Sequence, residues 1–255
     1  MSPSHLSPSH MSMNLTTPAV ALAIGAHPDD VEFGCGATLA KWAKAGCVVH
    51  HLICTDGSKG SWDPSVDIAE LVVTRQAEQR SAAQALGATG QCVFLGWPDG
   101  ELESGLRQRW EVAYWIRRLQ PTVVLGHDPW KRYRLHPDHR HAGLLVTDGV
   151  VAARDPHFFP EQALPHHRPD ALLLFEADEP DHVEDVGGYA DVKLGALHSH
   201  RSQLLSTMHI DETASTDEAE RQRRAFDDRT RAKLAAHGAL QGVAEGEAFK
   251  LITTL

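Results

Sequence analysis

Short apolar runs recur along this chain, with longer stretches of mixed character between them. The first run, Val20–Ile24, lies between Pro18 and Gly25, and a run of this length with such flanks predicts a buried strand. The same argument predicts strands at residues 47–54, 91–95, 122–126 and 171–175, and a last edge strand at 248–252. We expect these strands to form the centre of the fold.

Helical patterns fill the intervals between the apolar runs. They cover residues 34–45, 68–86, 106–119, 137–153 and 217–237, the last of these highly charged. Gly46 and Gly87 are natural helix stops, and Pro137 suits a first helical turn. Strands and helices that alternate in this way predict an α/β fold, a single Rossmann-like, doubly wound domain whose mostly parallel central sheet is flanked by helices.

The first 17 residues have a different composition from the rest. They are rich in Ser, Pro, His and Met, and they repeat Ser-Pro-Ser-His at residues 2–5 and 7–10. This composition predicts a disordered N-terminal arm at 1–17, before a domain at 18–255. The arm lacks the charged start and long apolar centre of a secretory signal, which favours a cytoplasmic protein.

Charge and cysteine content narrow the class of partner. The 255 residues include 24 Lys and Arg against 34 Asp and Glu, so the formal charge is 24 − 34 = −10. An acidic chain with no basic block argues against nucleic acid or an anionic membrane as the main partner, and no stretch is apolar enough to span a membrane. The four cysteines form no Cys-X-X-Cys pair, so we expect buried, reduced thiols in the cytoplasm.

Candidate chemistry begins directly after the first predicted strand. His27-Pro28-Asp29-Asp30 follows it, and ligands of open α/β sheets bind at the carboxyl ends of the strands. His27 and Asp30 can hold one ion, which leaves Asp29 between them as a base. The motif predicts a metal-dependent hydrolase.

A second motif of the same kind, His136-Pro137-Asp138-His139, follows the strand predicted at 122–126. Catalytic zinc sites usually keep three protein ligands and leave the fourth position to water. His27, Asp30 and one histidine of the second motif make such a set. Spacing alone leaves open whether that histidine is His136 or His139.

Together the two motifs resemble the LmbE-like, or PIG-L, family of metal-dependent N-acetylglucosamine deacetylases. Weaker matches to the family pattern are Thr55-Asp56-Gly57, Arg75 with Glu78, Pro98-Asp99-Gly100, and Lys193, Ala196, Leu197, His200, Ser202 and Gln203. The resemblance covers residues 18 to 205, with a weaker match at residues 247–249. It implies a deacetylase domain at 18–255.

For the metal centre, the resemblance implies that the ion is zinc, although iron(II) would accept the same ligands. The ligands it implies are His27, Asp30 and His139. Asp29 is then the general base that takes a proton from water and passes it to the leaving amine. His136, protonated and oriented by Asp138, is expected to stabilise the oxyanion.

The substrate contacts that we expect are Arg75, held by Glu78, together with Asp99, Arg134 and His200. Some relatives have a tyrosine at the position of Arg134. His200 is equally compatible with a structural role, and the Arg75–Glu78 spacing alone suits an exposed salt pair. Trp62, in a polar loop after the second strand, suits either sugar stacking or simple packing.

The resulting hypothesis is a hydrolase of linear amide C–N bonds that deacetylates an N-acetylglucosamine-containing small molecule or glycoconjugate. The alternative within this class is an amidase for a larger conjugate, such as a thiol-sugar conjugate or an antibiotic scaffold. A metal-free nucleotide-binding or methyltransferase-like domain predicts a full glycine fingerprint, which Leu39 breaks after Gly34 and Gly36. A non-catalytic binding subunit would have no need of Asp29. Relatives often assemble, so a homo-oligomer stays open.

Overall fold

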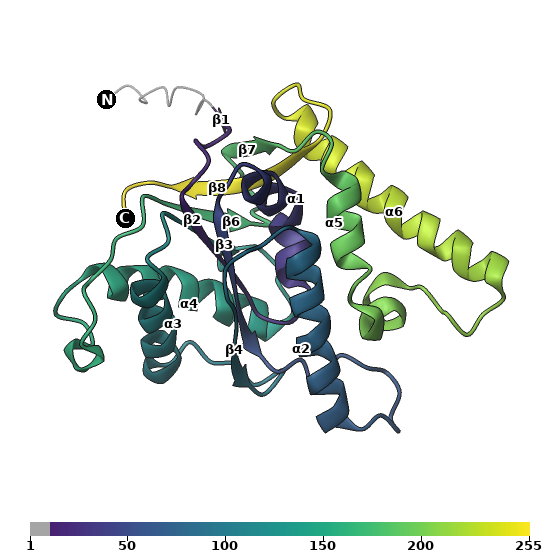
Figure 1. The fold of residues 1–255 in the computed structure, drawn as a ribbon, viewed down its shortest axis with the longest axis horizontal. Helices are drawn as coiled ribbons and strands as arrows, with labels where there is room; N and C mark the ends of the chain where they lie inside the picture. The colour runs from purple at the N-terminus through teal and green to yellow at the C-terminus, as the bar shows by residue number, and fades with distance from the viewer. Residues whose placement is uncertain (1–10) are drawn as a thin grey trace, which may run out of the picture.

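An eight-stranded sheet runs through the middle of the molecule in the computed structural model, which describes residues 11–255 (Figure 1). Its central strands are parallel, and they are β2 (Val20–Gly25), β3 (Val48–Thr55), β4 (Cys92–Trp97), β5 (Val123–His127) and β6 (Ala171–Phe175). All five match predicted strands to within two residues at each end. The predicted fold class is therefore confirmed.

The order of these strands creates a crevice at one place in the sheet. They run β6-β5-β2-β3-β4, so the chain moves outward in one direction from β2 to β4 and then starts again on the other side of β2 with β5. Ligands of doubly wound folds bind where the order reverses, beyond the carboxyl ends of the two strands. In this chain those two strands are β2 and β5, which lead into the two His-Pro-Asp motifs.

The other side of the sheet differs from our expectation. Strand β8 (Gly246–Ile252) pairs antiparallel with both β6 and β7 (His182–Asp185), so it lies inside the sheet and the prediction of an edge strand is wrong. Strand β1 (Ser12–Met13) then pairs with β7. These two residues therefore do not belong to a disordered arm, because backbone pairing orders them without any apolar pattern. The rest of the predicted arm, residues 1–10, lies outside the described residues.

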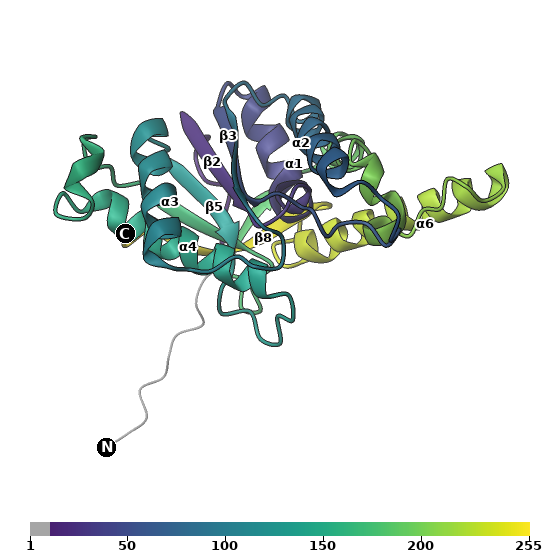
Figure 2. The same cartoon turned by 90° about the horizontal axis from the view of Figure 1, so that it is seen from below.

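Helices cover both faces of the sheet (Figure 2). Helices α1 (Asp30–Lys44), α2 (Ile68–Ala85) and α5 (Ala190–Leu197) contribute to one apolar cluster, and α3 (Leu106–Leu119) and α4 (Pro137–Arg154) contribute to the other. Alternate residues of β2 face the two clusters, Ala21 and Ala23 on one side and Leu22 and Ile24 on the other. A strand that is buried on both faces needs an unbroken apolar run, and this explains why β2 could be predicted from the sequence.

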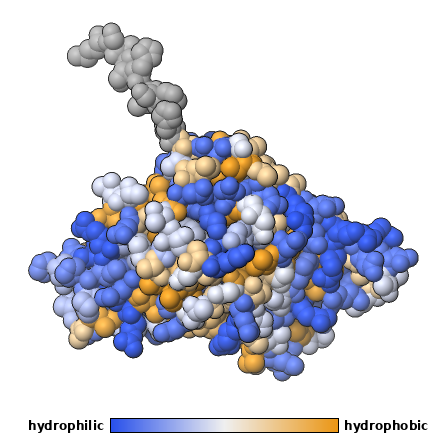
Figure 3. Space-filling model, turned by 45° about the horizontal axis from the view of Figure 1, so that its top comes forward, coloured by the Kyte–Doolittle hydropathy of each residue, from blue (hydrophilic) through white to orange (hydrophobic). Residues whose placement is uncertain are grey.

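Helix α6 (Thr216–Ala239) extends away from the sheet, and only Phe226, Leu234 and Gly238 of its 24 residues are buried. The region where it lies, on the right of Figure 3, is largely hydrophilic. The prediction of a charged and mostly solvated helix is thus confirmed. Within residues 11–255, no helix combines the length and apolar character needed to cross a membrane.

The first helix starts earlier than predicted. Helix α1 begins at Asp30 instead of Gly34, and the backbone leaves helical geometry once, at Cys35. Gly34 is required there because a Cβ atom would lie only 2.6 Å from the ring of Phe175. The early start places Asp29 at the N-cap, so the first His-Pro-Asp motif straddles the junction of loop and helix.

The cysteines are free, as the absence of a Cys-X-X-Cys pair predicts. Cys35, Cys47 and Cys54 are buried and Cys92 is half buried. Burial raises the pKa of Cys47 to about 11, so this thiol stays neutral near pH 7.

Candidate metal centre

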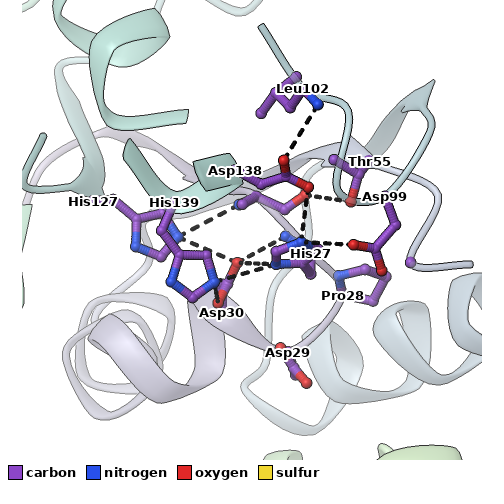
Figure 4. Close-up of polar contacts among 12 residues, drawn as sticks. His27, Pro28, Asp29, Asp30, Thr55, Asp99, Leu102, His127, Asp138 and His139 are labelled. Atoms are coloured by element: carbon purple, nitrogen blue, oxygen red, sulfur yellow. Dashed lines mark hydrogen bonds and ion pairs between the residues drawn. The ribbon is translucent and has the colours of Figure 1, made fainter. Parts of the chain in front are cut away.

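The two His-Pro-Asp motifs meet at the crevice between β2 and β5 (Figure 4). His27 Nδ1 lies 3.2 Å from His139 Nε2 and 3.4 Å from Asp30 Oδ2. The other oxygen of Asp30 lies 3.3 Å from His139 Nε2. The structure therefore brings together three donor groups from segments more than 100 residues apart.

The geometry of these three groups fits a divalent cation. Ligand atoms about 2.0–2.1 Å from a tetrahedral zinc ion lie about 3.3 Å from one another, which is close to the three distances observed. Two imidazoles and a carboxylate are also suitable donors. The side chains of residues 11–255 form three overlapping groups that can hold a metal: His27, His136 and His139; Asp30, His127 and His139; and His27, Asp99 and Asp138. The set His27, Asp30 and His139 takes its members from the first two.

Carboxylates hold the far nitrogen of His27. Its Nε2 lies 3.1 Å from Asp138 Oδ2 and 3.2 Å from Asp99 Oδ1, so Nε2 carries a proton, and Nδ1 is the nitrogen that can bind a cation once it is deprotonated. Burial by itself lowers the pKa of His27, but its hydrogen bonds to Asp138, Asp30 and Asp99 raise it well above the ordinary value. The surroundings of His27 therefore favour positive charge at this place.

Asp138 has a different role from the expected one. We predicted that it orients His136, but its carboxylate accepts hydrogen bonds from the backbone N–H groups of Gly100 (2.6 Å) and Leu102 (3.2 Å) and faces His27. It is fully buried, whereas His136 is exposed. The first turn of α4 points Asp138 inward, so it orients the imidazole of the other motif.

His127 is a site residue that the motif analysis missed. It ends β5, its Nε2 lies 3.2 Å from Asp30 Oδ2, and its ring stacks on His139 at 4.5 Å. Burial raises the pKa of Asp30, but the charges of His139 and His127 outweigh it and hold that pKa well below its usual range. The sequence did contain a signal for this role, because His127 directly follows the strand predicted at 122–126, at the carboxyl end where ligands bind.

Arg134 was expected to bind substrate, but the structure places it behind His139. Its Nη1 lies 2.7 Å from His139 Nδ1, its Nη2 lies 2.6 Å from Glu176 Oε2, and it is not among the residues that line the cavity. Because a guanidinium only donates, Nδ1 of His139 must accept, and the ring proton sits on Nε2. A neutral imidazole that binds a cation through Nε2 carries its proton on Nδ1, so cation binding requires Arg134 Nη1 to move away from that nitrogen.

Asp29 lies beside the three metal-binding groups and belongs to none of them. Figure 4 shows its side chain apart from the cluster of His27, Asp30 and His139. Its carboxylate is buried, and Arg75 Nη2 lies 3.5 Å from Oδ2. Burial raises the pKa of Asp29 to about 6, against the opposing charge of Arg75. A carboxylate with such a pKa can take up and release a proton near neutral pH.

Arg75 is almost completely buried. It lines the cavity, but it also donates hydrogen bonds to the backbone oxygens of Gly57 (2.8 Å) and Pro28 (2.7 Å). We expected Glu78 to hold it, and that is wrong. Glu78 accepts from the backbone N–H and the hydroxyl of Ser202, because its side chain leaves α2 toward the segment after α5.

A cavity of about 450 Å³ opens in front of the cluster. It is lined by His27, Asp29, Asp30, Phe33, Lys59, Gly60, Trp62, Arg75, Asp99, Gly100, His136, His139, Glu176, Gln203, Ser206, Thr207 and Lys233. Trp62 is 72% exposed at this cavity, which favours a surface for a ligand over simple packing. Asp99 also lies at the wall. The volume suits a small molecule of one or two sugar rings.

His136 and His200 differ in their relation to this cavity. His136 lines it, packed edge-on against His27 at 4.7 Å. Partial desolvation of its ring and the neighbouring His27 lower the pKa of His136, which favours the neutral form of the ring. His200 does not line the cavity. It is fully buried, with Nε2 3.2 Å from Glu32 Oε2, and the prediction that it binds substrate is wrong because the α1 side of the sheet encloses it.

Comparisons with known proteins agree with this geometry. The family model PIG-L, described as GlcNAc-PI de-N-acetylase, matches residues 22–150. A diacetylchitobiose deacetylase of Thermococcus kodakarensis is 36% identical over 186 residues, which are 72% of this chain and 69% of the relative. A 1D-myo-inositol 2-acetamido-2-deoxy-alpha-D-glucopyranoside deacetylase of Mycolicibacterium gilvum is 28% identical over 228 residues (72% of this chain, 80% of the relative).

Among solved structures, this chain is similar to an N,N'-diacetylchitobiose deacetylase from Pyrococcus horikoshii in complex with its inhibitor MPG. The TM-score is 0.81 at 28% identity, and the match covers 92% of this chain and 84% of the other. The similarity thus extends well beyond the residues that the family model matches.

Proposed function

Since this chain belongs to the PIG-L family and is a deacetylase, we propose that it is a zinc-dependent hydrolase that removes the acetyl group from an N-acetylglucosamine-containing small molecule or glycoconjugate. The observation that carries this proposal is the meeting of His27, Asp30 and His139 beside Asp29, at the wall of a cavity. The names of two relatives support the substrate class, because both are deacetylases of small acetamido sugars.

His27 Nδ1, the Asp30 carboxylate and His139 Nε2 are the proposed ligands of the ion. A divalent cation held there would supply Lewis acidity, which activates water and polarises the amide carbonyl. Asp138 and Asp99 keep the His27 ring in the required tautomer. Iron(II) is the second candidate for the ion, since two histidines and a carboxylate also suit it.

Asp29 is the proposed general base. It accepts a proton from the attacking water, whose oxygen bonds to the acetyl carbon, and then donates the proton to the nitrogen as the C–N bond breaks. The products are acetate and the free amine. Arg75, 3.5 Å from Asp29, limits how far burial can raise its pKa and keeps it able to accept the proton.

The cavity wall holds the acetamido sugar in this scheme. His136 donates an N–H to the developing oxyanion, which a neutral imidazole can do as well as a charged one. Asp99 accepts hydrogen bonds from sugar hydroxyls, and Trp62 offers a flat face for a ring. Arg134 and His200 do not line the cavity, and neither contacts the substrate in this scheme.

Acetate release tests the proposal. We expect purified, zinc-supplemented protein to release acetate from N,N'-diacetylchitobiose or another N-acetylglucosamine conjugate, to lose this activity after dialysis against a chelator, and to regain it with Zn²⁺ or Fe²⁺. Activity that survives complete metal removal would contradict the metal-dependent scheme. Cleavage of a larger acyl amide without acetate release would favour the alternative, an amidase that acts on a thiol-sugar conjugate or an antibiotic scaffold.

A further inference from the structure

The backbone at Asp29, directly after Pro28, has an unusual conformation. Asp29 has φ of 110° and ψ of −28°, and side chains other than glycine rarely adopt a positive φ. Such strain persists only where the surrounding structure holds it, and it is often found at functional sites. This conformation also sets the direction in which the Asp29 side chain leaves the backbone. If Asp29 is the base, the groups that hold its backbone therefore position the base.

Helix α2 holds both polar atoms of the peptide bond between Pro28 and Asp29. Arg75 Nη2 donates to the carbonyl oxygen of Pro28 at 2.7 Å, and the N–H of Asp29 donates to Gln79 Oε1 at 2.9 Å. Arg75 and Gln79 are four residues apart and so lie on one face of the helix. The peptide is therefore clamped between two side chains of one rigid element.

The orientation of the Gln79 amide is determined by its neighbours. Its Nε2 donates to Glu32 Oε1 at 2.8 Å, and the other Glu32 oxygen lies 3.2 Å from His200 Nε2. Gln79, Glu32 and His200 are all fully buried. If the amide were turned over, its NH₂ would face the N–H of Asp29 and its oxygen would face a carboxylate. The Glu32 carboxylate thus accepts hydrogen bonds from both His200 and Gln79, and this leaves the Gln79 oxygen to accept from the N–H of Asp29.

We propose that Gln79 is a positioning residue for the reaction, which keeps the strained Asp29 backbone in place so that the carboxylate faces the cavity. This inference rests on the proposed function, because it assumes that Asp29 is the base. Gln79 itself does not line the cavity. It acts through the peptide bond of Asp29, and Glu32 and His200 keep its amide oriented.

The first test is Gln79→Met, which retains the length of the side chain and removes the hydrogen bonds of the amide to Asp29, Glu32 and His51. We expect kcat for N,N'-diacetylchitobiose to fall about 10- to 100-fold, the usual loss when a supporting partner is removed, while KM and the zinc content stay near wild type. A crystal structure of the variant should show a negative φ at Asp29. Gln84→Met, at an exposed position of the same helix, is the matched control and should leave kcat unchanged.

The second test exchanges the amide and the acid. Gln79→Glu alone places two carboxylates face to face and should lower kcat at least as much as Gln79→Met. The double variant Glu32→Gln with Gln79→Glu restores the hydrogen bonds that link positions 200, 32, 79 and 29 with the same net charge, and we expect it to recover most of the wild-type kcat. A purely packing role for Gln79 predicts no such recovery.

An unchanged kcat in Gln79→Met, or an unchanged Asp29 φ in its crystal structure, would overturn the inference. Failure of the double exchange to recover kcat would also count against it. If the wild-type protein releases acetate from no N-acetyl sugar, the proposed function fails, and the Asp29 φ of the variant still decides whether Gln79 holds the backbone.

Discussion

Replacement of Asp29 by asparagine is expected to lower kcat about 10³-fold, within the range that general acid–base catalysis contributes. The amide has nearly the same shape and can still form polar contacts with Arg75, but it cannot accept the proton of water at neutral pH. The backbone at this position should be retained, because asparagine tolerates a positive φ better than most residues. Steady-state assay of acetate release measures the effect.

Zinc content and thermal unfolding serve as controls for Asp29→Asn. Both should stay near wild type, because Asp29 belongs to none of the groups that can hold a metal. Turnover equal to wild type would show that the base assignment is wrong. Loss of zinc from the variant would instead indicate that Asp29 is a ligand.

The second large effect is expected at His139. His139→Ala removes the donor atom that lies 3.2 Å from His27 Nδ1 and 3.3 Å from Asp30. The loss of a direct ligand should weaken zinc binding by more than about 100-fold, the upper end of what the loss of a supporting partner costs. Activity should disappear with the metal. Zinc titration of the metal-free variant, monitored by calorimetry, measures the affinity directly.

His136→Ala is the matched comparison from the same motif. His136 faces the cavity three residues before His139, so its removal should lower kcat while leaving zinc affinity within a few fold of wild type. If His136→Ala empties the site and His139→Ala does not, the two histidines have exchanged roles and the ligand set must be redrawn.

The parts of this molecule that sequence predicts well are those that a single physical requirement determines. Strand β2 is buried on both faces, and only an unbroken apolar run such as Val20–Ile24 satisfies that. Strand β7, by contrast, contains His182 and Glu184, which pair with each other in a buried position, so its sequence shows no apolar pattern. Strand β1 is held by its backbone pairing with β7 and by the Ser12 hydroxyl, which lies 2.8 Å from His182 Nδ1.

The same distinction applies to the candidate site. The two His-Pro-Asp motifs could be assigned to one place because each follows a predicted strand, and parallel strands end at the same edge of a sheet. The partners of individual side chains could not be assigned, since they depend on which way each helix turns. Asp138 therefore faces His27 instead of His136, Glu78 holds Ser202 instead of Arg75, and Gln79 received no role at all.

The central claim is that both motifs bind one cation, and anomalous X-ray diffraction from zinc-soaked crystals, at wavelengths on either side of the zinc edge, tests it most directly. We predict a single strong peak in the crevice, about 2.0–2.2 Å from His27 Nδ1, an Asp30 oxygen and His139 Nε2. A zinc peak at another place in the protein, with these three side chains in contact only with one another, would contradict the claim.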